Sequence, residues 1–346
     1  MKRIVVASMA AGDGKTSMIV GIAGAIGKKI GYLKPFGDRL LYRKKRLWDY
    51  DAALVTRVFR LKEKAEDITV GFRHAKLGYL ADEGTAREKV LEILDGVSPD
   101  CEYLFVEGGK GLAYGLSIHL DSLSLRRYLN GTLLFVANGS GEDGGLDDLL
   151  ALQKYLAAEK DTLSGVIINK IKDPDDYREV FLPRIERLGI PVLGLVPERR
   201  ELGCLSGNHL ADRLFATVLT GEEHLGRLIE NVLVMPMDLS EARKHPLFSA
   251  PGKLVMTDGN RPDLVEAALE GDTSCVLLTG GMEPPEGLVT RARDLGIPML
   301  LVSLDLLSSI RQVDRIEPLL MQNDTVRIGI LEDLVRENVR LEAILS

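Results

Sequence analysis

Short, almost continuously apolar runs alternate along the first part of the chain with longer segments whose apolar positions recur at helical spacing. The runs are rich in Val, Ile, Leu and Phe, which predicts buried β-strands. The predicted strands span residues 3–7, 30–33, 103–106, 133–136, 165–168 and 192–195, and the predicted helices span residues 15–26, 51–59, 86–94, 146–157 and 177–188. Because these strands have no polar face, we expect an α/β fold: a mostly parallel sheet with helices on both faces.

The rest of the chain repeats this pattern on a smaller scale. After a helical stretch at residues 209–231, the pattern predicts strands at 253–256, 275–278 and 298–302, and helices at 262–268, 288–295 and 306–313. A last amphipathic helix is expected at 326–345, with Ile330, Leu334, Leu341 and Ile344 on one face. The prediction is two α/β domains, residues 1–212 and a smaller one at residues 213–346.

Composition and charge limit the classes of function. Apolar residues make up 45% of the 346 residues, as in folded globular proteins, and the apolar stretches are shorter than the about 20 residues of a membrane helix. With no signal peptide and three cysteines that we interpret as buried, reduced thiols, we expect a cytoplasmic protein. Residues 213–346 contain 13 basic and 21 acidic residues. This acidic part disfavours nucleic acids and membranes as partners, because both are bound through cations.

The strongest chemical motif is Ser8-Met-Ala-Ala-Gly12-Asp-Gly14-Lys15-Thr16, which follows a predicted strand and opens a predicted helix. In this context a glycine-rich loop binds phosphates through backbone N–H groups and the helix N-terminus. Lys15 would reach the β and γ phosphates of ATP, and the Thr16 hydroxyl would coordinate Mg²⁺. Residues predicted to bind the nucleotide in this loop are Gly12, Asp13, Gly14, Lys15, Thr16 and Ser17.

Two features keep other interpretations of the loop open. Met9 stands where phosphate loops have their first glycine, so a chance Gly-Lys-Thr at a helix start is one alternative. A dinucleotide fingerprint is disfavoured because Ser17 replaces its last glycine. The glycines of the following helix, Gly21, Gly24 and Gly27, are interpreted as close-packing contacts against the sheet.

Three charged residues lie where predicted elements meet the carboxyl edge of the sheet. Lys34 follows the second strand, Asp51 opens a helix and Glu107 ends the third strand. Ligands of open α/β sheets bind at this edge, and carboxylate oxygens suit Mg²⁺, so Thr16, Asp51 and Glu107 are predicted metal ligands. Lys15, Lys34 and Glu107 are the candidate catalytic residues. Singly, they could instead be a surface lysine, a helix cap and a turn residue. The basic cluster, Arg39 together with residues 43–46, is either a solvated loop or faces a small anionic substrate.

The order of these motifs is informative. The phosphate loop is followed by Lys34-Pro35, Asp51-Ala52, Glu107-Gly-Gly, Asn169 and the segment at residues 189–198. This order resembles the dethiobiotin synthetase-like P-loop family, most closely the branch found at the N-terminus of long phosphotransacetylases, over about residues 1–212. The resemblance implies that Lys15 and Thr16 hold phosphate and Mg²⁺, and that Asp51 and Glu107 complete the metal site. It also implies that Lys34 meets substrate or γ-phosphate, and that Asn169 and Pro197 border the adenine.

Residues 257–264 and 278–281 resemble the DRTGG domain, which accompanies this P-loop domain in phosphotransacetylases and also occurs in regulatory pyrophosphatases. The sequence departs from the motif at Gly259-Asn260-Arg261. Gly280 and Gly281 could admit a phosphate or a partner backbone, or form a tight strand-to-helix turn. The resemblance implies a homodimer, since related synthetases build sites at a subunit interface and DRTGG domains self-associate.

Two functions remain after these observations. One is a nucleotide-dependent regulatory or sensor protein with weak ATPase activity, which the sequence slightly favours. The other is an ATP-dependent ligase that phosphorylates a small carboxylate or carbamate; the loop lacks the Thr and Glu of the synthetase. A third possibility, a former enzyme kept as a structural module, is disfavoured because Lys15, Thr16, Asp51 and Glu107 are intact. Because the sequence ends at Ser346, we expect no acetyltransferase domain and no phosphotransacetylase activity.

Overall fold

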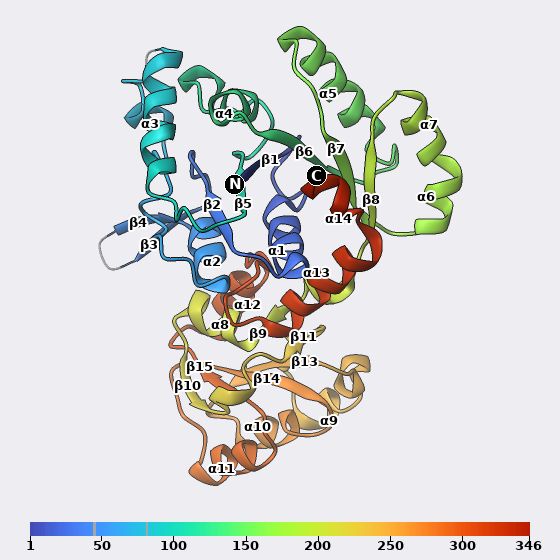
Figure 1. Cartoon of the computed structure of the whole chain (residues 1–346). Helices are drawn as coiled ribbons and strands as arrows, with labels where there is room; N and C mark the ends of the chain where they lie inside the picture. The colour runs from blue at the N-terminus through green and yellow to red at the C-terminus, as the bar shows by residue number, and fades with distance from the viewer. Residues whose placement is uncertain (44–45, 81) are drawn as a thin grey trace. The chain divides into compact units, whose positions relative to one another are not determined.

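The computed structural model describes residues 1–43, 46–80 and 82–346 (Figure 1). Its contacts divide the chain into two compact units. The first contains Met1–Glu198 together with Arg327–Ser346, and the second contains Arg199–Val326. In the described part of the chain, no helix combines the length and the apolar character that crossing a bilayer requires.

A six-stranded parallel sheet forms the core of the first unit, with the order β2-β5-β1-β6-β7-β8. All six predicted strands are present, and the predicted fold class is confirmed. The strands are β1 Lys2–Ser8, β2 Ile30–Leu33, β5 Tyr103–Glu107, β6 Thr132–Asn138, β7 Gly165–Ile171 and β8 Val192–Pro197. The helices are α1 Lys15–Ile26, α2 Tyr50–Val58, α3 Glu83–Asp95, α4 Ser122–Leu129, α5 Leu146–Glu159, α6 Pro174–Val180 and α7 Leu182–Arg187.

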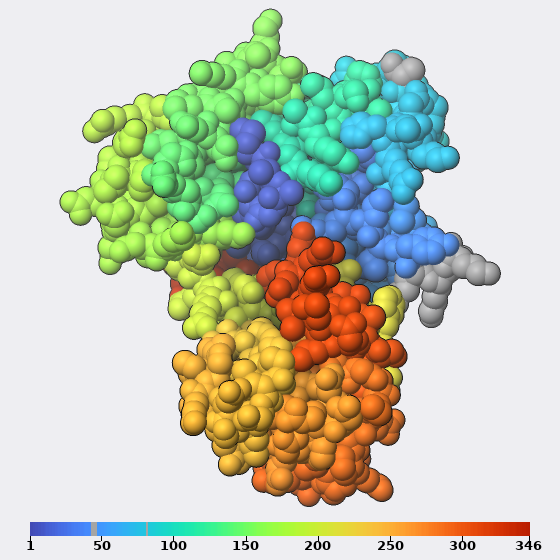
Figure 2. Space-filling model, turned by 180° about the vertical axis from the view of Figure 1, so that it is seen from behind, coloured from blue at the N-terminus to red at the C-terminus, as the bar shows by residue number. Residues whose placement is uncertain are grey.

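The position of β1 in this sheet determines where a ligand can bind. The chain leaves β1 through α1 toward β2 on one side, whereas it passes from β5 through α4 to β6 in the opposite direction. Right-handed crossovers then place α1 and α4 on opposite faces (Figure 1). The carboxyl end of β1 lies between β5 and β6, at the point where the winding changes direction, which is where open α/β sheets bind ligands. In Figure 2 the start of the chain, in dark blue, reaches the surface between green and blue-green segments.

Three local features of the first unit differ from the prediction. A hairpin of β3 Leu40–Arg43 and β4 Arg46–Asp49 occupies the segment expected to be a loop, and Lys44 and Lys45 of the basic cluster lie outside the described residues. Helix α4 was not predicted; Asp121 caps it by accepting from the N–H groups of Leu123 and Ser124. The predicted helix at 177–188 is split into α6 and α7 because Pro183 has no N–H to continue the helix.

The second unit contains a five-stranded sheet with the order β10-β15-β14-β13-β12, in which only the β10–β15 pair is antiparallel. Its strands are β10 Thr217–Thr220, β12 Asn231–Val234, β13 Lys253–Asp258, β14 Thr273–Thr279 and β15 Met299–Leu301, with a short pair β9 Leu205–Ser206 and β11 Leu228–Ile229. Its helices are α8 Gly207–Leu214, α9 Leu239–Ala242, α10 Pro262–Ala268, α11 Glu286–Asp294 and α12 Leu306–Val313. Short 3₁₀ turns in the chain are η1 His74–Lys76, η2 Leu116–Ile118, η3 Arg200–Gly203, η4 Glu222–His224 and η5 Pro246–Ser249.

The predicted helix at 209–231 is wrong beyond its first turns. Helix α8 ends where Phe215 adopts a φ of 51°, and β10 follows at once. Two of the four residues of β10 are threonines and one is valine, and such β-branched side chains favour strands. The antiparallel partner β15, more than seventy residues later, completes the strand; that pairing is invisible to a local pattern.

The C-terminal segment belongs to the first unit, whereas the sequence placed it with the second. It forms α13 Thr325–Asn338 and α14 Leu341–Leu345. Helix α13 lies against α1 (Figure 1), so close that a Cβ on Gly21 would be 2.8 Å from the Leu331 carbonyl oxygen. A Cβ on Gly24 would likewise meet the Glu332 side chain. The close-packing role predicted for these glycines is therefore right, but their neighbour is α13, not the sheet, and Gly27 caps the end of α1 with a φ of 59°.

Substituting Gly21 tests this helix contact. Gly21→Val should destabilise the first unit by about 1–3 kcal/mol, because the new side chain would meet backbone that has no room to yield. Thermal unfolding should then occur several degrees lower. Gly329→Ala is the matched control: it lies in α13 with no heavy atom within 4 Å of the added Cβ, and should leave the Tm equal or slightly higher. Equal melting of Gly21→Val and the unaltered protein would mean that α13 does not hold this position.

Candidate nucleotide-binding site

The loop between β1 and α1 is shaped by two glycines in the left-handed region. Gly12 has a φ of 88°, and Gly14, which precedes the first residue of α1, has a φ of 103°. A Cβ on Gly14 would be 2.2 Å from Nδ2 of Asn169, so a larger residue has no space there. Asp13 closes the turn by accepting, through Oδ2, from the Ala10 N–H at 2.8 Å. The loop is therefore a tight turn that requires glycine at two positions.

Lys15 is held inside this turn. Its side chain is buried, and Nζ donates to Ser8 Oγ at 2.8 Å and to the Lys110 carbonyl at 3.5 Å. Burial lowers the pKa of Lys15, although the Glu107 charge acts in the opposite direction. Both hydrogen-bond acceptors of Nζ are neutral groups, so an anion placed at the loop would be a stronger partner for this ammonium.

The three predicted metal ligands and Lys34 are brought together beside the loop. Thr16 Oγ1 donates to Glu107 Oε1 at 3.0 Å, and Lys34 Nζ donates to the same oxygen at 3.0 Å. Lys34 also donates to Asp51 Oδ2 at 2.6 Å. The remaining Glu107 oxygen, Oε2, accepts from the Tyr32 hydroxyl at 2.8 Å. Residues from β2, β5, α1 and α2 thus meet in one buried cluster.

Two more carboxylates belong to this cluster, and the sequence analysis missed them. Asp38 lies 3.1 Å and Asp49 3.8 Å from Lys34 Nζ, and the carboxylate oxygens of Asp38, Asp49 and Asp51 lie within 4.8 Å of one another. Asp49 is the cap of α2, accepting from the Ala52 N–H at 3.0 Å. The helix-cap alternative for Asp51 is therefore wrong: Asp51 is in the first turn, with its side chain on Lys34. The acidic spacing Asp49-Tyr-Asp51 was the available signal.

Burial and the neighbouring charges shift the pKa values of the cluster in opposite directions. Burial raises the pKa of Glu107 and of Asp49, with Lys34 opposing it in both cases. Burial also works to raise the pKa of Asp51, but Lys34 and Arg39 outweigh it and the pKa is lowered. For Lys34 itself, burial would lower the pKa, yet the charges of Glu107, Asp51, Asp49 and Asp38 hold it well above the usual value. The positive charge of Lys34 therefore offsets the unfavourable effect of burial on these carboxylates.

The remaining predicted residues lie at the loop and at the ends of neighbouring strands. Asn169 in β7 donates from Nδ2 to the Asp13 carbonyl at 2.9 Å, and so buttresses the loop. The next residue, Lys170, was not predicted; its Nζ donates to the Gly12 carbonyl at 2.8 Å. Ser17 lies in the first turn of α1, and Pro197 ends β8 opposite Ile171.

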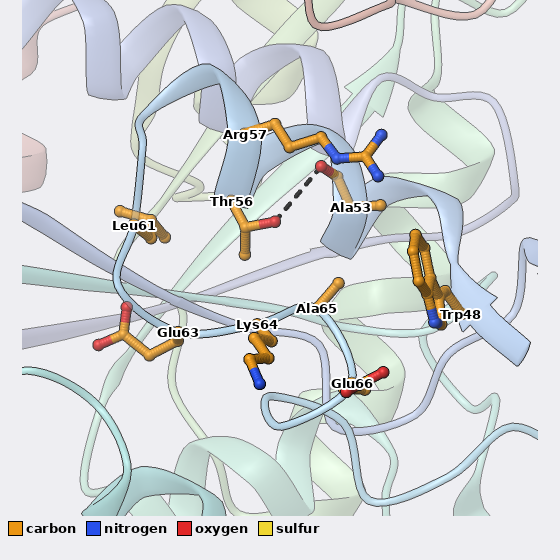
Figure 3. A pocket seen from close by; sticks show the side chains of 9 residues that line it. All are labelled: Trp48, Ala53, Thr56, Arg57, Leu61, Glu63, Lys64, Ala65 and Glu66. Atoms are coloured by element: carbon orange, nitrogen blue, oxygen red, sulfur yellow. Dashed lines mark hydrogen bonds between the residues drawn. The ribbon is translucent and has the colours of Figure 1, made fainter. Parts of the chain in front are cut away.

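A separate cavity of about 370 Å³ lies on α2 and the loop that follows it (Figure 3). In this view Trp48 and Leu61 stand on opposite sides, with charged side chains of both signs between them. The Arg57 guanidinium lies over the Trp48 ring at 5.6 Å, and Thr56 Oγ1 donates to the Ala53 carbonyl. None of the residues that line this cavity is predicted to bind phosphate or metal. The lining residues are Trp48, Ala53, Thr56, Arg57, Leu61, Glu63, Lys64, Ala65 and Glu66.

In the second unit, Gly280 and Gly281 form a tight turn, which is one of the two alternatives that the sequence analysis gave for them. Their φ values are 80° and 68°, and their N–H groups donate to the carbonyls of Leu304 and Val302 at 2.7 and 2.9 Å. These amides are therefore already used within the unit. A cavity of about 430 Å³ adjoins the turn, with Asp258, Asn260, Thr279 and Asp305 among its lining.

Comparison with known protein families also separates the chain into two parts. The profile of the AAA domain matches residues 2–204, and that of the DRTGG domain matches residues 209–316. Phosphate acetyltransferases of Synechocystis sp. and Nitrosomonas europaea are each 24% identical to the chain, over 96% and 100% of its length and 50% and 52% of theirs. The chain thus spans about half the length of the curated relatives it matches.

Among solved structures, the cell division protein MinD of Aquifex aeolicus matches 58% of this chain and 84% of its own, at 18% identity and a TM-score of 0.36. The CBS and DRTGG domains of the Clostridium perfringens pyrophosphatase regulatory region match 54% and 74%, at 14% identity and a TM-score of 0.30. The predicted order, a P-loop domain and then a DRTGG domain, is confirmed, and it is the architecture that supports nucleotide binding. The chain belongs to the AAA domain family.

Proposed function

We propose that the first unit binds Mg²⁺-ATP at the loop of Ser8 to Thr16, and that the protein acts as a nucleotide-dependent regulator or sensor with weak ATPase activity. The observation that supports nucleotide binding best is the buried Lys15 ammonium, whose hydrogen-bond acceptors among the described residues are neutral groups, inside a turn built on Gly12 and Gly14. The triphosphate would supply its missing anionic partner. Asp13, Ser17, Asn169 and Pro197 would complete the nucleotide site.

The donor set beside the loop fits magnesium. Thr16, Asp51 and Glu107 offer one hydroxyl and two carboxylates, the hard oxygen ligands that Mg²⁺ prefers. When bound, the ion would neutralise charge on the phosphates. Lys15 would hold the β and γ phosphates, and the loop amides would orient them.

The arrangement of Lys34 favours sensing over rapid phosphoryl transfer. Three carboxylate oxygens lie within 3.1 Å of its ammonium, and the side chain is 1% exposed. A lysine that is to meet a substrate or a γ-phosphate must first leave these partners, so we expect slow turnover. We also propose that the protein is a cytoplasmic homodimer.

The alternative is a ligase that phosphorylates a small carboxylate or carbamate. One observation favours it: Lys34 and Arg39 both bind Asp51, so two cations stand together at the sheet edge, where they could bind an anionic substrate. ATP turnover with Mg²⁺, measured with and without a panel of small carboxylates, separates the two functions. Tight binding with negligible turnover throughout supports the sensor, whereas a large stimulation by one carboxylate supports the ligase.

Glu107→Gln tests the metal site. The amide keeps the size of the side chain but loses its charge, so ATP affinity should change by less than about threefold while turnover falls at least about tenfold. Calorimetry with Mg²⁺-ATP and a phosphate-release assay measure the two quantities. Glu102→Gln is the control, because Glu102 is half exposed in a surface pair with Lys28 and should change neither. Unaltered turnover in Glu107→Gln would remove this residue from the metal site.

A further inference from the structure

The Lys34 ammonium occupies the centre of the carboxylates that are proposed to hold the metal. It donates to Asp51 Oδ2 and to Glu107 Oε1, at 2.6 and 3.0 Å. Thr16 Oγ1 bonds to the same Glu107 oxygen at 3.0 Å. A side chain of the protein itself, Lys34, therefore already contacts oxygens of two proposed metal ligands with its positive charge.

An ammonium and a magnesium ion cannot use these oxygens together. Magnesium needs its oxygens at about 2.0–2.1 Å in near-octahedral geometry, whereas the ammonium fills the same space with hydrogen bonds. A divalent ion would also stand close to the positive charge of Lys34. Occupation by one cation therefore excludes the other.

The charge balance of the cluster depends on Lys34. Four carboxylates, those of Asp38, Asp49, Asp51 and Glu107, surround it. Among the residues that the structure describes, the other cations that act on the cluster are Arg39, bound to Asp51 Oδ1 at 3.3 Å, and Lys15 in the loop. Within this described set, the negative charges would exceed the positive ones by two without Lys34, which is the charge that a divalent cation supplies.

We propose that Lys34 is an internal cation that occupies the metal position while nucleotide is absent and leaves it when Mg²⁺-ATP binds. This inference rests on the proposed function and concerns the regulation of the same site. Free Mg²⁺ finds its ligands already bound, so the ion enters only with the nucleotide. The triphosphate is what makes the exchange favourable, since its oxygens offer the displaced ammonium a new anionic partner.

The position of Lys34 is suited to such a movement. It directly follows β2, so its backbone is anchored at the edge of the sheet while its side chain is a flexible stem of four carbons. The loop of Gly12 and Gly14 and the Lys34 cluster meet through Thr16 and Glu107. The ammonium therefore has the proposed phosphate site as a neighbour to which it can turn.

The test uses Lys34→Met in the full chain without nucleotide. In EDTA the variant should melt several degrees below the unaltered protein, and millimolar MgCl₂ should restore most of that loss by binding the vacated carboxylates. The unaltered protein should change by less than about 1 °C with the same MgCl₂. Electron paramagnetic resonance with Mn²⁺ reads occupancy directly, and the variant should bind Mn²⁺ at least about tenfold more tightly than the unaltered protein.

Two further variants make the result specific. Lys28→Met removes a half-exposed lysine of a surface pair and should leave melting and Mn²⁺ binding unchanged. The double variant Lys34→Met/Glu107→Gln should lose the rescue by MgCl₂. Equal Mn²⁺ affinity of the nucleotide-free protein with and without Lys34 would overturn the inference, as would a Lys34→Met variant that stays unfolded in MgCl₂.

The inference and the proposed function fail separately. If the unaltered protein binds Mg²⁺-ATP but Lys34→Met gains no Mn²⁺ site, the inference is wrong and the proposed function stands. If the unaltered protein does not bind ATP, the proposed function is wrong. A Mn²⁺ site that appears only in Lys34→Met would still support the exclusion of metal by Lys34.

Discussion

Lys15→Ala is expected to lower the affinity for Mg²⁺-ATP at least about 100-fold, which corresponds to about 3 kcal/mol of binding free energy. The reason is the environment of its ammonium, which is buried and, in the described part of the chain, donates to the Ser8 hydroxyl and the Lys110 carbonyl. A charge-assisted hydrogen bond to phosphate in such a site contributes about 1.5–3 kcal/mol, and Lys15 would make more than one. Calorimetric titration with Mg²⁺-ATP measures the loss.

The fold should survive this substitution. Burial opposes the charge of Lys15, so the apo protein loses little when the ammonium is removed, and its Tm should fall by no more than a few degrees. Lys28→Ala, which removes a half-exposed lysine of a surface pair, should leave the affinity for Mg²⁺-ATP unchanged. Equal affinity of Lys15→Ala and the unaltered protein for Mg²⁺-ATP would show that the loop is not the nucleotide site.

Lys34→Met, measured in EDTA near pH 8, should lose about 3–5 kcal/mol of the free energy of unfolding, because removing one partner of a buried ionic cluster leaves the others uncompensated. The partners left behind include Asp51 and Glu107, each buried and within 3.0 Å of the missing ammonium. Methionine fills nearly the same volume, so the loss reports charge and not a cavity. Urea unfolding measures it, and Lys28→Met is the control.

The loss should shrink as the pH falls. The pKa of Lys34 is raised, so its own contribution is fully present at every pH below its unfolded value and does not vary in this window. In the variant, Glu107 and Asp49 lose the charge that opposes their raised pKa, so their folded pKa values rise further above the unfolded ones. Asp51, whose pKa Lys34 and Arg39 hold below the usual value, loses the larger of these two influences, so its pKa also moves upward. A carboxyl with a raised pKa is stabilising in its protonated form, and this contribution is lost as the pH rises. The deficit should therefore be largest near pH 8 and smaller near pH 5; a deficit that does not vary with pH would contradict this account.

Local patterns in the sequence identified most of the fold because its strands and helices carry their own signals. The bounds of α1, α10 and α12 match the prediction. Helix α1 lies between the two glycines Gly14 and Gly27, α10 has a proline at its first position, and α12 has a clear apolar face. The failures lie where the deciding partner is distant in sequence. Strand β10 depends on β15, and the C-terminal helix α13 depends on the glycine face of α1.

The same limit applies to the candidate site. Lys34, Asp51 and Glu107 could be predicted because each is next to a recognisable strand or helix end. Asp38 and Asp49 were missed. Asp49 approaches Lys34 from the end of a hairpin that the sequence analysis took for a loop, and its spacing to Asp51 was the one local signal. Asp38 lies four residues after Lys34, before that hairpin, and no predicted strand or helix end marks it. The mutual neutralisation of Lys34 and its carboxylates likewise depends on distances, which spacing along the chain does not provide.

The return of the chain to the first unit after residue 326 matters for work with fragments. A piece cut after residue 204, the limit of the AAA domain match, omits α13 and uncovers the side of α1 that carries Gly21 and Gly24. Poor solubility or weak ATP binding of such a piece would then reflect a missing helix and say nothing about Lys15 or Thr16. The second unit, in contrast, is one uninterrupted stretch of chain and can be excised without removing any segment of the first.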